Sequence, residues 1–508
     1  MSEEKSMRAS CPYAKKCGGC DYQGISYREQ LKRKQKTVQD LLGGFAKVEP
    51  IMQAEHPEHY RNKVHGVFGR DKKGNVFTGI YEEKSHRIVP VENCGIENSG
   101  ATAILTTLCD MAKQFKLRIY DEDKETGLLR HALIRVGVRT GEIMVVLVLA
   151  DPIMPSKNNF VKELCRRHPE ITTIVLNIND KHTSMVLGER NITLYGKGYI
   201  EDILCGIRFR ISPSSFYQIN PEQTEKLYRK AMEFAALTGE EIVIDAYCGI
   251  GTIGMCAADK AKEVLGVELN KEAIRDAFQN AKRNQLQNVR FIHDDAGKYM
   301  VRMAGEHQKA DVVIMDPPRS GSTPEFIESV NKLKPERVVY VSCDPVTLKR
   351  DLELFAKKGW KVKRIQPVDM FPYTKHVETV VQLSKGDIDR DCSERKSITK
   401  AGDTGTISGY SKGNKAHETT NVKIDFSLEN LDMSELRGKA TYEQIKDYVR
   451  EQTGFRVSTL YISQVKRKCG LEVGESYNKP KSDDARQPQC TLEKEEAIMQ
   501  ALKHFGVI

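Results

Sequence analysis

The spacing of apolar and polar positions divides the chain into regions of different character. Between about residues 50 and 210, short apolar runs alternate with turn signals; the clearest runs are 63–69, 132–136 and 143–149. Gly74-Asn75 and Thr140-Gly141 have the composition of hairpin turns. This part of the chain is therefore predicted to be α+β, with an antiparallel sheet. An amphipathic helix is expected before it, over 27–42, with Lys32, Arg33, Lys34 and Lys36 along it.

The pattern changes at about residue 221, where apolar strands begin to alternate with amphipathic helices. The expected strands are 241–245, 264–268 and 289–292, and the expected helices are 221–237, one starting near Thr252, and 271–284. Strands that alternate with helices predict a parallel, doubly wound sheet. This pattern continues to about residue 384.

A polar stretch separates the doubly wound region from the C-terminal part of the chain. Residues 385–430 are rich in Ser, Thr, Gly, Lys and Asp, which is typical of a flexible linker. Two short helices, 441–452 and 458–468, are expected beyond it. The predicted organisation is 1–48 with cysteines and a basic helix, 49–210 central α+β domain, 211–384 doubly wound domain, 385–430 linker, and 431–508 helical extension.

Composition narrows the class of protein. Hydrophobic residues make up 39% and charged residues 29% of the 508 residues, as in soluble globular proteins. No apolar run approaches the ~20 residues of a membrane span, and the N-terminus lacks a signal peptide. We expect a cytoplasmic protein whose thirteen cysteines are reduced, metal-bound, catalytic or buried. The net charge of +9 permits a polyanionic partner without establishing one.

A glycine-rich turn after the strand at 241–245 is a candidate cofactor site. Gly249, Gly251 and Gly254 match the G-x-G-x-x-G spacing of dinucleotide sites, which leaves an NAD-dependent oxidoreductase as one alternative. Asp245 stands before the turn and would repel a pyrophosphate. Its carboxylate suits a ligand with a cationic amino group, such as S-adenosylmethionine.

Acidic residues also end the next two strands. Glu268 is placed to accept hydrogen bonds from ribose hydroxyls. Asp294 or Asp295, after the third strand, is placed to meet an adenine amino group. Acids at three successive strand ends support an adenosyl ligand better than the glycines alone.

A cysteine and two carboxylates form the candidate reactive site. Cys343, in Val341-Ser342-Cys343-Asp344-Pro345, follows an apolar run that is typical of a buried strand. A thiol delivered at such a strand end is well placed to act as a nucleophile. Asp316 closes another apolar run, 312–315, and Glu378 lies downstream. The set predicts an enzyme that attacks with a thiol and needs a separate carboxylate.

A second group of cysteines lies near the N-terminus. Cys11, Cys17 and Cys20 are spaced C-x5-C-x2-C, and Cys94 is the best candidate for a fourth ligand. Four thiolates hold either zinc or a [4Fe–4S] cluster, and the spacing does not choose between them.

With these motifs together, residues from about 10 to 384 resemble the RNA uracil-C5 methyltransferases, specifically the iron–sulfur-containing 23S rRNA branch. The motifs that carry the resemblance are the cysteine group, 215–220, 245–251, 316–319, 342–345 and 376–378. The resemblance implies a Rossmann-like S-adenosylmethionine-dependent methyltransferase domain and a [4Fe–4S] cluster. It implies that Cys343 is the nucleophile, that Glu378 is the base, and that the cofactor is bound by Gln218, Tyr247, Glu268 and Asp316. Asp245, Gly249 and Asp295 complete the predicted cofactor set.

The expected substrate is a uridine of 23S rRNA, bound by a monomer away from membranes. The T-loop uridine of tRNA is an alternative, although relatives that act on tRNA usually lack the cysteine group. A non-catalytic RNA-binding iron–sulfur protein is another. Many relatives begin with a β-barrel, which we expect to be absent because ten residues precede Cys11. RNA contacts are then expected from the following parts: 60–63, Arg130 and His131 of the central domain, the helix near 32–36, or a C-terminal helix-turn-helix with Lys466, Arg467 and Lys468.

Overall fold

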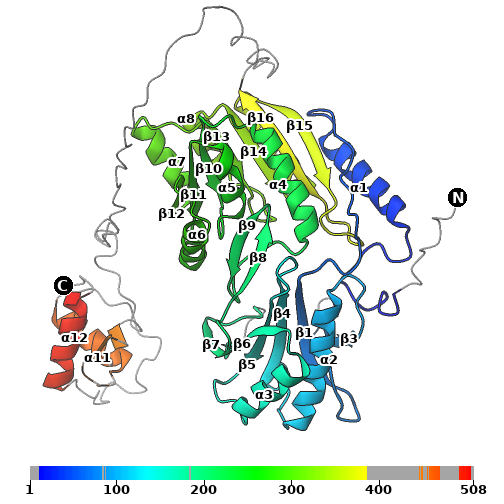
Figure 1. Ribbon diagram of the computed structural model, residues 1–508. Coiled ribbons are helices and arrows are strands. Elements are labelled where there is room, and N and C mark those ends of the chain that lie inside the picture. Colours follow the sequence, from blue (N-terminus) through cyan, green and yellow to red (C-terminus); the bar gives the residue numbers. More distant parts are fainter. Residues whose placement is uncertain are drawn as a thin grey trace, which may run out of the picture. The chain divides into compact units, whose positions relative to one another are not determined.

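The computed structural model of the chain (Figure 1) describes residues 11–82, 85, 87–181, 185–385, 445–446, 448–449, 453, 455, 457–469 and 491–504. It divides into two compact units, Met1–Thr399 and Lys400–Ile508. The linker predicted over 385–430 lies, beyond residue 385, outside the described residues. Among the residues that are described, no helix is both long and apolar enough to span a bilayer.

A seven-stranded sheet forms the middle of the first unit. Its order is β3 (Ile88–Pro90), β2 (Val76–Tyr81), β1 (Lys63–Arg70), β4 (Leu129–Val136), β5 (Ile143–Leu149), β6 (Ile171–Ile178) and β7 (Arg190–Tyr195). Helices α2 (Ser99–Gln114) and α3 (Lys157–Arg167) cover one face of this central sheet and share an apolar core with it. The predicted antiparallel sheet is confirmed, except that β5 and β6 run parallel because α3 crosses over between them.

A second seven-stranded sheet contains the doubly wound region. Its order is β12 (Val289–His293), β11 (Glu263–Glu268), β10 (Ile242–Ala246), β13 (Val312–Met315), β14 (Arg337–Ser342), β16 (Glu378–Lys385) and β15 (Trp360–Val368). The strands from β12 to β14 are parallel, as predicted. The prediction is wrong for β16, which enters between β14 and β15 antiparallel to both. The loop 369–377 reverses the chain there without a crossover helix, so the following strand must run the other way.

Helices cover both faces of this second sheet. One face carries α4 (Pro221–Ala235), α5 (Thr252–Ala257), the 3-10 turn Ala258–Lys260 and α6 (Lys271–Arg283). The other carries α1 (Tyr27–Leu42), α7 (Ala296–Gly305), α8 (Pro324–Leu333) and α9 (Pro345–Lys357). The strands are therefore buried on both sides, which explains their uninterrupted apolar runs.

A two-stranded ribbon, β8 (Ile200–Leu204) and β9 (Ile207–Ile211), lies between the two sheets in Figure 1. Its Leu204 and Phe209 share one apolar core with Met144 of the central sheet and Leu227 of α4. The ribbon thus joins the two sheets through a continuous core, and it holds the segment that follows β9 close to both.

Helix α1 occupies the predicted residues, but its packing differs from expectation. Val38 and Leu42 are buried in the core that α9 and β15 share. The Lys34 side chain is fully buried and pairs with Asp369. Lys34 is therefore unavailable to RNA in this structure, which corrects the expectation for that part of the helix.

The second unit has its own small core. Helices α11 (Thr459–Lys468) and α12 (Leu492–His504) pack with Ile445, Val449 and Val457. The helix predicted over 458–468 is confirmed, whereas much of 441–452 lies outside the described residues. Helix α12 was not predicted.

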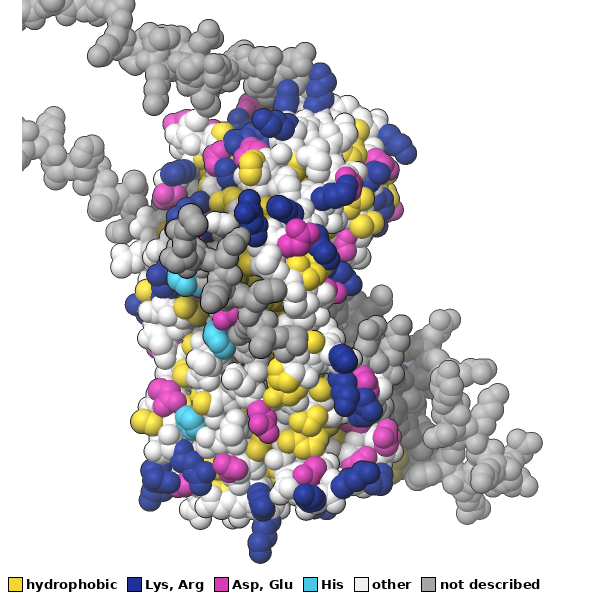
Figure 2. Space-filling view, turned by 90° about the vertical axis from the view of Figure 1, so that its right-hand side faces the viewer, with side chains coloured by type: hydrophobic (Ala, Val, Ile, Leu, Met, Phe, Trp, Pro, Cys, Tyr) yellow, Lys and Arg dark blue, Asp and Glu magenta, His cyan; other side chains and the backbone are white. Residues whose placement is uncertain are grey.

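On the face in Figure 2, described Lys and Arg side chains stand among Asp and Glu side chains rather than in one block.

Candidate active site

The predicted reactive residues meet at one edge of the second sheet. Asp245 lies within β10, Asp316 directly follows β13, and Cys343 directly follows β14. The carboxyl ends of these parallel strands share an edge. Because β16 is antiparallel, its first residue, Glu378, reaches the same edge. The pairing of Ser342 with Thr379 places Cys343 beside Glu378.

Cys343, Glu378 and Asp316 are electrostatically coupled. Burial, and then the charge of Asp316, raise the pKa of Glu378 to about 8, while the Arg319 cation opposes the rise. Burial raises the pKa of Asp316 to about 7. Burial, Glu378 and Asp316 raise the pKa of the Cys343 thiol to about 12, again against Arg319. The thiol is therefore neutral at rest, and two carboxyl groups with pKa values near neutrality lie close to it.

The glycine-rich turn provides a cradle beside Asp245. Gly249 and Gly251 take φ values of 55° and 83°, a region that favours glycine. The Gly254 N–H donates to Asp245 Oδ2 at 2.7 Å, and a Cβ at Gly254 would lie 2.7 Å from that oxygen. Asp245 Oδ1 is buried and has no hydrogen-bond partner among the residues that the structure describes. Burial is also the main cause that raises the pKa of Asp245 to about 7. An unpaired buried carboxylate oxygen fits a cationic ligand group.

Glu268 and Tyr247, two further predicted cofactor residues, are held by contacts with their neighbours. Glu268 accepts from the N–H groups of Gly249 and Asn270, at 3.0 and 2.8 Å. Each carboxylate oxygen keeps a further lone pair, so ribose hydroxyls could still donate to it. The Tyr247 ring packs on Phe326 with 5.1 Å between ring centroids.

Asp294 and Asp295 each have a structural partner. Asp295 caps α7 by accepting the Lys298 N–H at 2.9 Å. Asp294 pairs with Arg302 at 2.7 Å. The structure therefore does not choose between these two acids for the adenine contact, and Asp295 stays a prediction.

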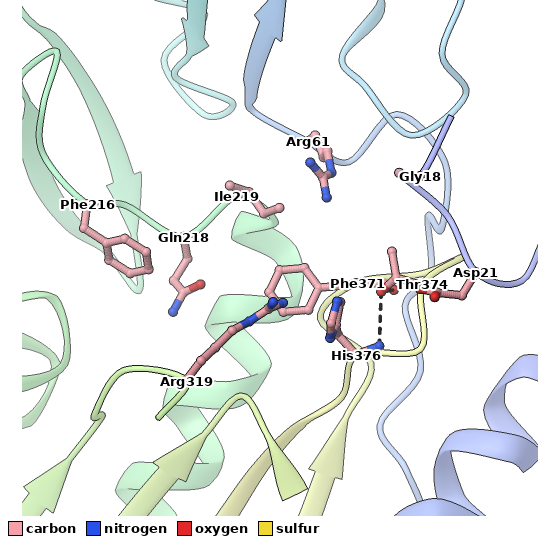
Figure 3. Close-up of a pocket in the computed structure, with 11 residues that line it drawn as sticks. Gly18, Asp21, Arg61, Phe216, Gln218, Ile219, Arg319, Phe371, Thr374 and His376 are labelled. Carbon is pink, nitrogen blue, oxygen red and sulfur yellow. Dashed lines mark hydrogen bonds between the residues drawn. The ribbon is translucent and has the colours of Figure 1, made fainter. Parts of the chain in front are cut away.

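Gln218 lines a cavity of about 390 Å³, and Arg319 lines the same cavity. Figure 3 shows Gln218, Arg61, Arg319 and His376 pointing into this space from separate segments of the chain. The complete lining is Gly18, Gly19, Asp21, Arg61, Phe216, Gln218, Ile219, Arg319, Phe371, Thr374 and His376. Phe216 and Phe371 had no predicted role, although Phe216 lies in the motif 215–220 that the sequence analysis singled out. Phe216 is 66% exposed, which is unusual for a large apolar side chain.

The structure corrects most of the expected RNA contacts in the central domain. Arg130 is buried and paired with Glu122, and His131 is buried against His65. Both were expected at the surface. Tyr60 and Asn62 are also buried. The Tyr60 hydroxyl donates to the Pro372 carbonyl, and the Asn62 amide donates to the Gln218 carbonyl. These two side chains hold the walls of the cavity, and Arg61 remains at its surface.

The four predicted metal ligands lie in one region. Burial raises the pKa of Cys20, and the charges of Cys17 and Cys11 add to the rise. Cys20 and Cys94 both pack on a small core that includes Tyr373. Within the described ranges, however, no three His, Cys, Asp or Glu side chains stand close enough together to hold a metal ion. The structure gathers the thiols without a ligating arrangement, and the metal site stays a prediction.

Comparison with known proteins agrees with this site. The family profile described as tRNA (uracil-5-)-methyltransferase matches residues 26–386. An uncharacterized RNA methyltransferase of Halalkalibacterium halodurans is 44% identical over 382 residues, which are 74% of this chain and 83% of that protein. One of Caldanaerobacter subterraneus is also 44% identical, over 74% of this chain and 84% of its own length.

A solved structure is similar over the same part of the chain. It is the Pyrococcus abyssi tRNA (uracil-54, C5)-methyltransferase in complex with S-adenosyl-L-homocysteine. The TM-score is 0.62 at 30% identity, and the match covers 72% of this chain and 85% of that one. The cofactor of this chain is S-adenosylmethionine, and Asp245 with its glycine turn fits it. The chain belongs to the tRNA (uracil-5-)-methyltransferase family, whose members are RNA uracil-C5 methyltransferases.

Proposed function

We propose that this protein methylates C5 of a uridine in 23S rRNA, giving 5-methyluridine through a covalent bond between Cys343 and C6. The observation that carries the proposal is the meeting of Cys343, Glu378 and Asp316 at one sheet edge, next to the cofactor turn. An inactive RNA-binding protein has no use for a buried thiol flanked by two carboxyl groups. That alternative is therefore disfavoured.

The chemistry follows from the weakness of uracil C5 as a carbon nucleophile. The Cys343 thiol first gives up its proton, for which the nearby Asp316 carboxylate is the acceptor. When the sulfur bonds to C6, the C5–C6 π electrons move toward the C4 carbonyl and C5 becomes enolate-like. S-adenosylmethionine supplies the methyl group as an electrophile. Glu378 then removes the C5 proton, the electron pair re-forms the C5–C6 double bond, and the sulfur leaves as a thiolate. The target base must leave its stack to reach the thiol.

We assign the cofactor residues by their surroundings. Asp245 accepts the methionyl amino group through its unpartnered Oδ1, and Glu268 accepts the ribose hydroxyls. Asp316 couples electrostatically both to Asp245 and to the Cys343–Glu378 pair. It therefore stands between the cofactor and the pyrimidine. Gln218, Tyr247, Gly249 and Asp295 complete the set.

We also propose that Cys11, Cys17, Cys20 and Cys94 hold a [4Fe–4S] cluster with a structural role, since methyl transfer consumes no electrons. Anaerobically purified protein should contain iron and acid-labile sulfide in equal amounts. Cys94→Ser should lose both, whereas Cys109→Ser, a buried cysteine outside this group, should retain them. If the wild-type protein contains zinc and no sulfide, the proposed [4Fe–4S] cluster is wrong and the four thiolates bind zinc instead.

A T-loop uridine of tRNA is the second candidate substrate. The solved Pyrococcus abyssi relative, at 30% identity over most of its length, is a tRNA (uracil-54, C5)-methyltransferase. The cysteine group at the N-terminus favours rRNA, because the tRNA enzymes of the resemblance usually lack it. Mapping 5-methyluridine in rRNA and tRNA from cells with and without the gene separates the two substrates.

The covalent mechanism is tested with RNA that contains 5-fluorouridine. Fluorine at C5 cannot be removed by a base, so a protein–RNA adduct should accumulate and survive denaturing electrophoresis. Cys343→Ala should abolish the adduct, while Cys165→Ala, a cysteine of α3 that packs against the core of the central sheet, should retain it. An adduct that persists in Cys343→Ala would remove the nucleophile assignment.

A further inference from the structure

The loop 369–377, which joins β15 to β16, connects the cavity at Gln218 to the proposed base. Phe371, Thr374 and His376 of this loop line the cavity, and Glu378 follows it directly as the first residue of β16. Any displacement of the loop therefore moves one cavity wall and the start of the strand that carries Glu378. The contacts that hold the loop decide where that carboxylate lies.

Helix α1 holds the beginning of the loop through a buried ion pair. Lys34 Nζ donates to Asp369 Oδ1 at 2.5 Å and to the Phe371 carbonyl at 2.9 Å. The Tyr27 hydroxyl donates to Asp369 Oδ2 at 2.7 Å. The side chains of Lys34 and Asp369 are both 0% exposed. A buried pair with both carboxylate oxygens satisfied has a strongly preferred geometry, since a shift of either partner leaves a charge unpaired.

The same N-terminal segment holds the middle of the loop. The Tyr373 N–H donates to Gln30 Oε1 at 2.9 Å, and the Tyr373 carbonyl accepts from the N–H groups of Asp21 and Tyr22 at 3.1 and 3.0 Å. The Lys375 N–H donates to Asp21 Oδ2 at 3.0 Å. Tyr373 has a φ of 67°, a conformation that costs a non-glycine residue free energy. Such a residue persists only where its surroundings hold it.

Other elements contact the opposite side of the loop. The Asn220 amide donates to the Met370 carbonyl at 3.0 Å, and the Tyr60 hydroxyl donates to the Pro372 carbonyl at 3.1 Å. These contacts come from the segment that carries Gln218 and from the start of the central sheet. The loop is therefore held from two sides, by these elements and by the segment 21–34. The N-terminal segment supplies the buried cation, Lys34.

We propose that the segment 21–34 positions the catalytic base, with Lys34, Tyr27 and Gln30 as positioning residues for Glu378. This inference rests on the proposed role of Glu378. The helix that was predicted to contact RNA therefore acts on the base instead. It does so through the loop 369–377, which directly precedes Glu378. A misplacement of about 1 Å in an active site costs on the order of 100-fold in rate.

The test separates adduct formation from adduct resolution. Lys34→Met keeps the length of the side chain and leaves Asp369 without its cation. With 5-fluorouridine RNA, the full-length variant should form the Cys343 adduct at the wild-type rate, since that step does not use Glu378. With ordinary RNA and S-adenosylmethionine, it should resolve the adduct roughly 10- to 100-fold more slowly and accumulate it. Tyr27→Phe, which removes one hydroxyl, should show the same pattern more weakly and serves if Lys34→Met does not fold.

Asp40→Asn is the matched control, because it breaks the exposed Lys36–Asp40 pair on the same helix. It should behave like the wild type. Amide hydrogen exchange gives a readout without RNA. The Tyr373 and Lys375 amides should exchange faster in Lys34→Met and unchanged in Asp40→Asn, while β10 and β13 stay protected.

The outcomes distinguish this inference from the proposed function. If the wild-type protein forms no adduct with 5-fluorouridine RNA, the proposed function fails, and the exchange data still show whether α1 holds the loop. If the wild type reacts and Lys34→Met and Tyr27→Phe resolve the adduct at the wild-type rate, the positioning inference is overturned. Equal slowing of adduct formation and resolution would overturn it as well, because a general structural loss affects both steps.

Discussion

The two seven-stranded sheets bury titratable side chains of opposite type, which are acidic in the second sheet and basic in the central sheet. The second sheet places Asp245, Asp316 and Glu378 at one edge, where burial raises their pKa values to about 7, 7 and 8. The central sheet buries basic groups instead. There burial lowers the pKa of Lys63 to about 8, of His65 to about 4 and of His131 to about 3. Both sheets therefore hold groups in their neutral forms more readily than water does.

The two sets of groups differ in what they contact. The acids of the second sheet lie beside the glycine-rich turn and the Cys343 thiol. Arg135 of the central sheet donates to the backbone carbonyls of Pro213 and Ser215, just before Phe216 and Gln218. The acids are placed for chemistry, whereas Arg135 holds the segment that forms a cavity wall. A shifted pKa therefore points to a functional group only together with what that group contacts, since buried histidines of the central sheet have shifted pKa values as well.

The largest expected effect is on turnover. Glu378→Gln keeps the size of the side chain and removes the base, so the rate of 5-methyluridine formation should fall roughly 100- to 10,000-fold. The variant should still form the adduct, and it should trap it on ordinary RNA, seen by denaturing electrophoresis. Glu336→Gln, an exposed acid at the far end of β14, is the control. If Glu378→Gln methylates ordinary RNA at the wild-type rate, Glu378 is not the base. The contrast between the two sheets is then weaker.

The same substitution should change the pH dependence of stability. A carboxyl group whose pKa is raised from 4.5 to about 8 on folding contributes stability below about pH 4.5, and loses it as pH rises to about 8. At pH 8, Glu378→Gln should therefore be more stable than the wild type by about 4 kcal/mol, and at pH 4 the two should be alike. Urea unfolding at both pH values measures this. A variant that is destabilised at pH 8 would show that Glu378 is charged and well paired in the folded protein.

Cofactor affinity should show the next largest effect. Asp245→Asn keeps an acceptor for the Gly254 N–H but removes the negative charge that faces the amino group. A lost charge-assisted hydrogen bond of about 2 kcal/mol weakens S-adenosylhomocysteine binding roughly 30-fold, measured by calorimetry. Asp259→Asn, an exposed acid after α5, should bind as the wild type does. Unchanged affinity in Asp245→Asn would place the amino group elsewhere.

The central sheet should show a pH dependence of stability with the opposite sign. A histidine whose pKa is lowered from 6.5 to about 3 contributes stability above pH 6.5 and loses it as pH falls toward 3. His131→Gln should thus reduce the loss of stability between pH 7 and pH 4 by about 3 kcal/mol, and leave the alkaline side unchanged. Thermal unfolding across this range measures it. An effect confined to alkaline pH would contradict the contrast between the sheets.

Local periodicity accounts for what the sequence predicted well. The helix over 27–42 and the strands over 143–149 and 312–315 were placed to the residue. Their apolar spacing or uninterrupted apolar runs are local properties, and Gly74 and Gly141 mark turns through a backbone conformation that favours glycine. Cys343, Asp316 and Asp245 were found in the same way, because each stands at or beside the end of a recognisable strand.

Only the tertiary structure decided which distant residues meet. Tyr27 and Asp369 are 342 positions apart in the chain, and nothing local distinguishes the buried Lys34 from the exposed Lys36 of the same helix. The antiparallel entry of β16 brings Glu378 beside Cys343, and it depends on a chain reversal that apolar spacing does not encode. The sequence by itself determined the elements and the reactive residue types, because these follow from local spacing. The fold decided their partners, because burial and pairing depend on the whole chain at once.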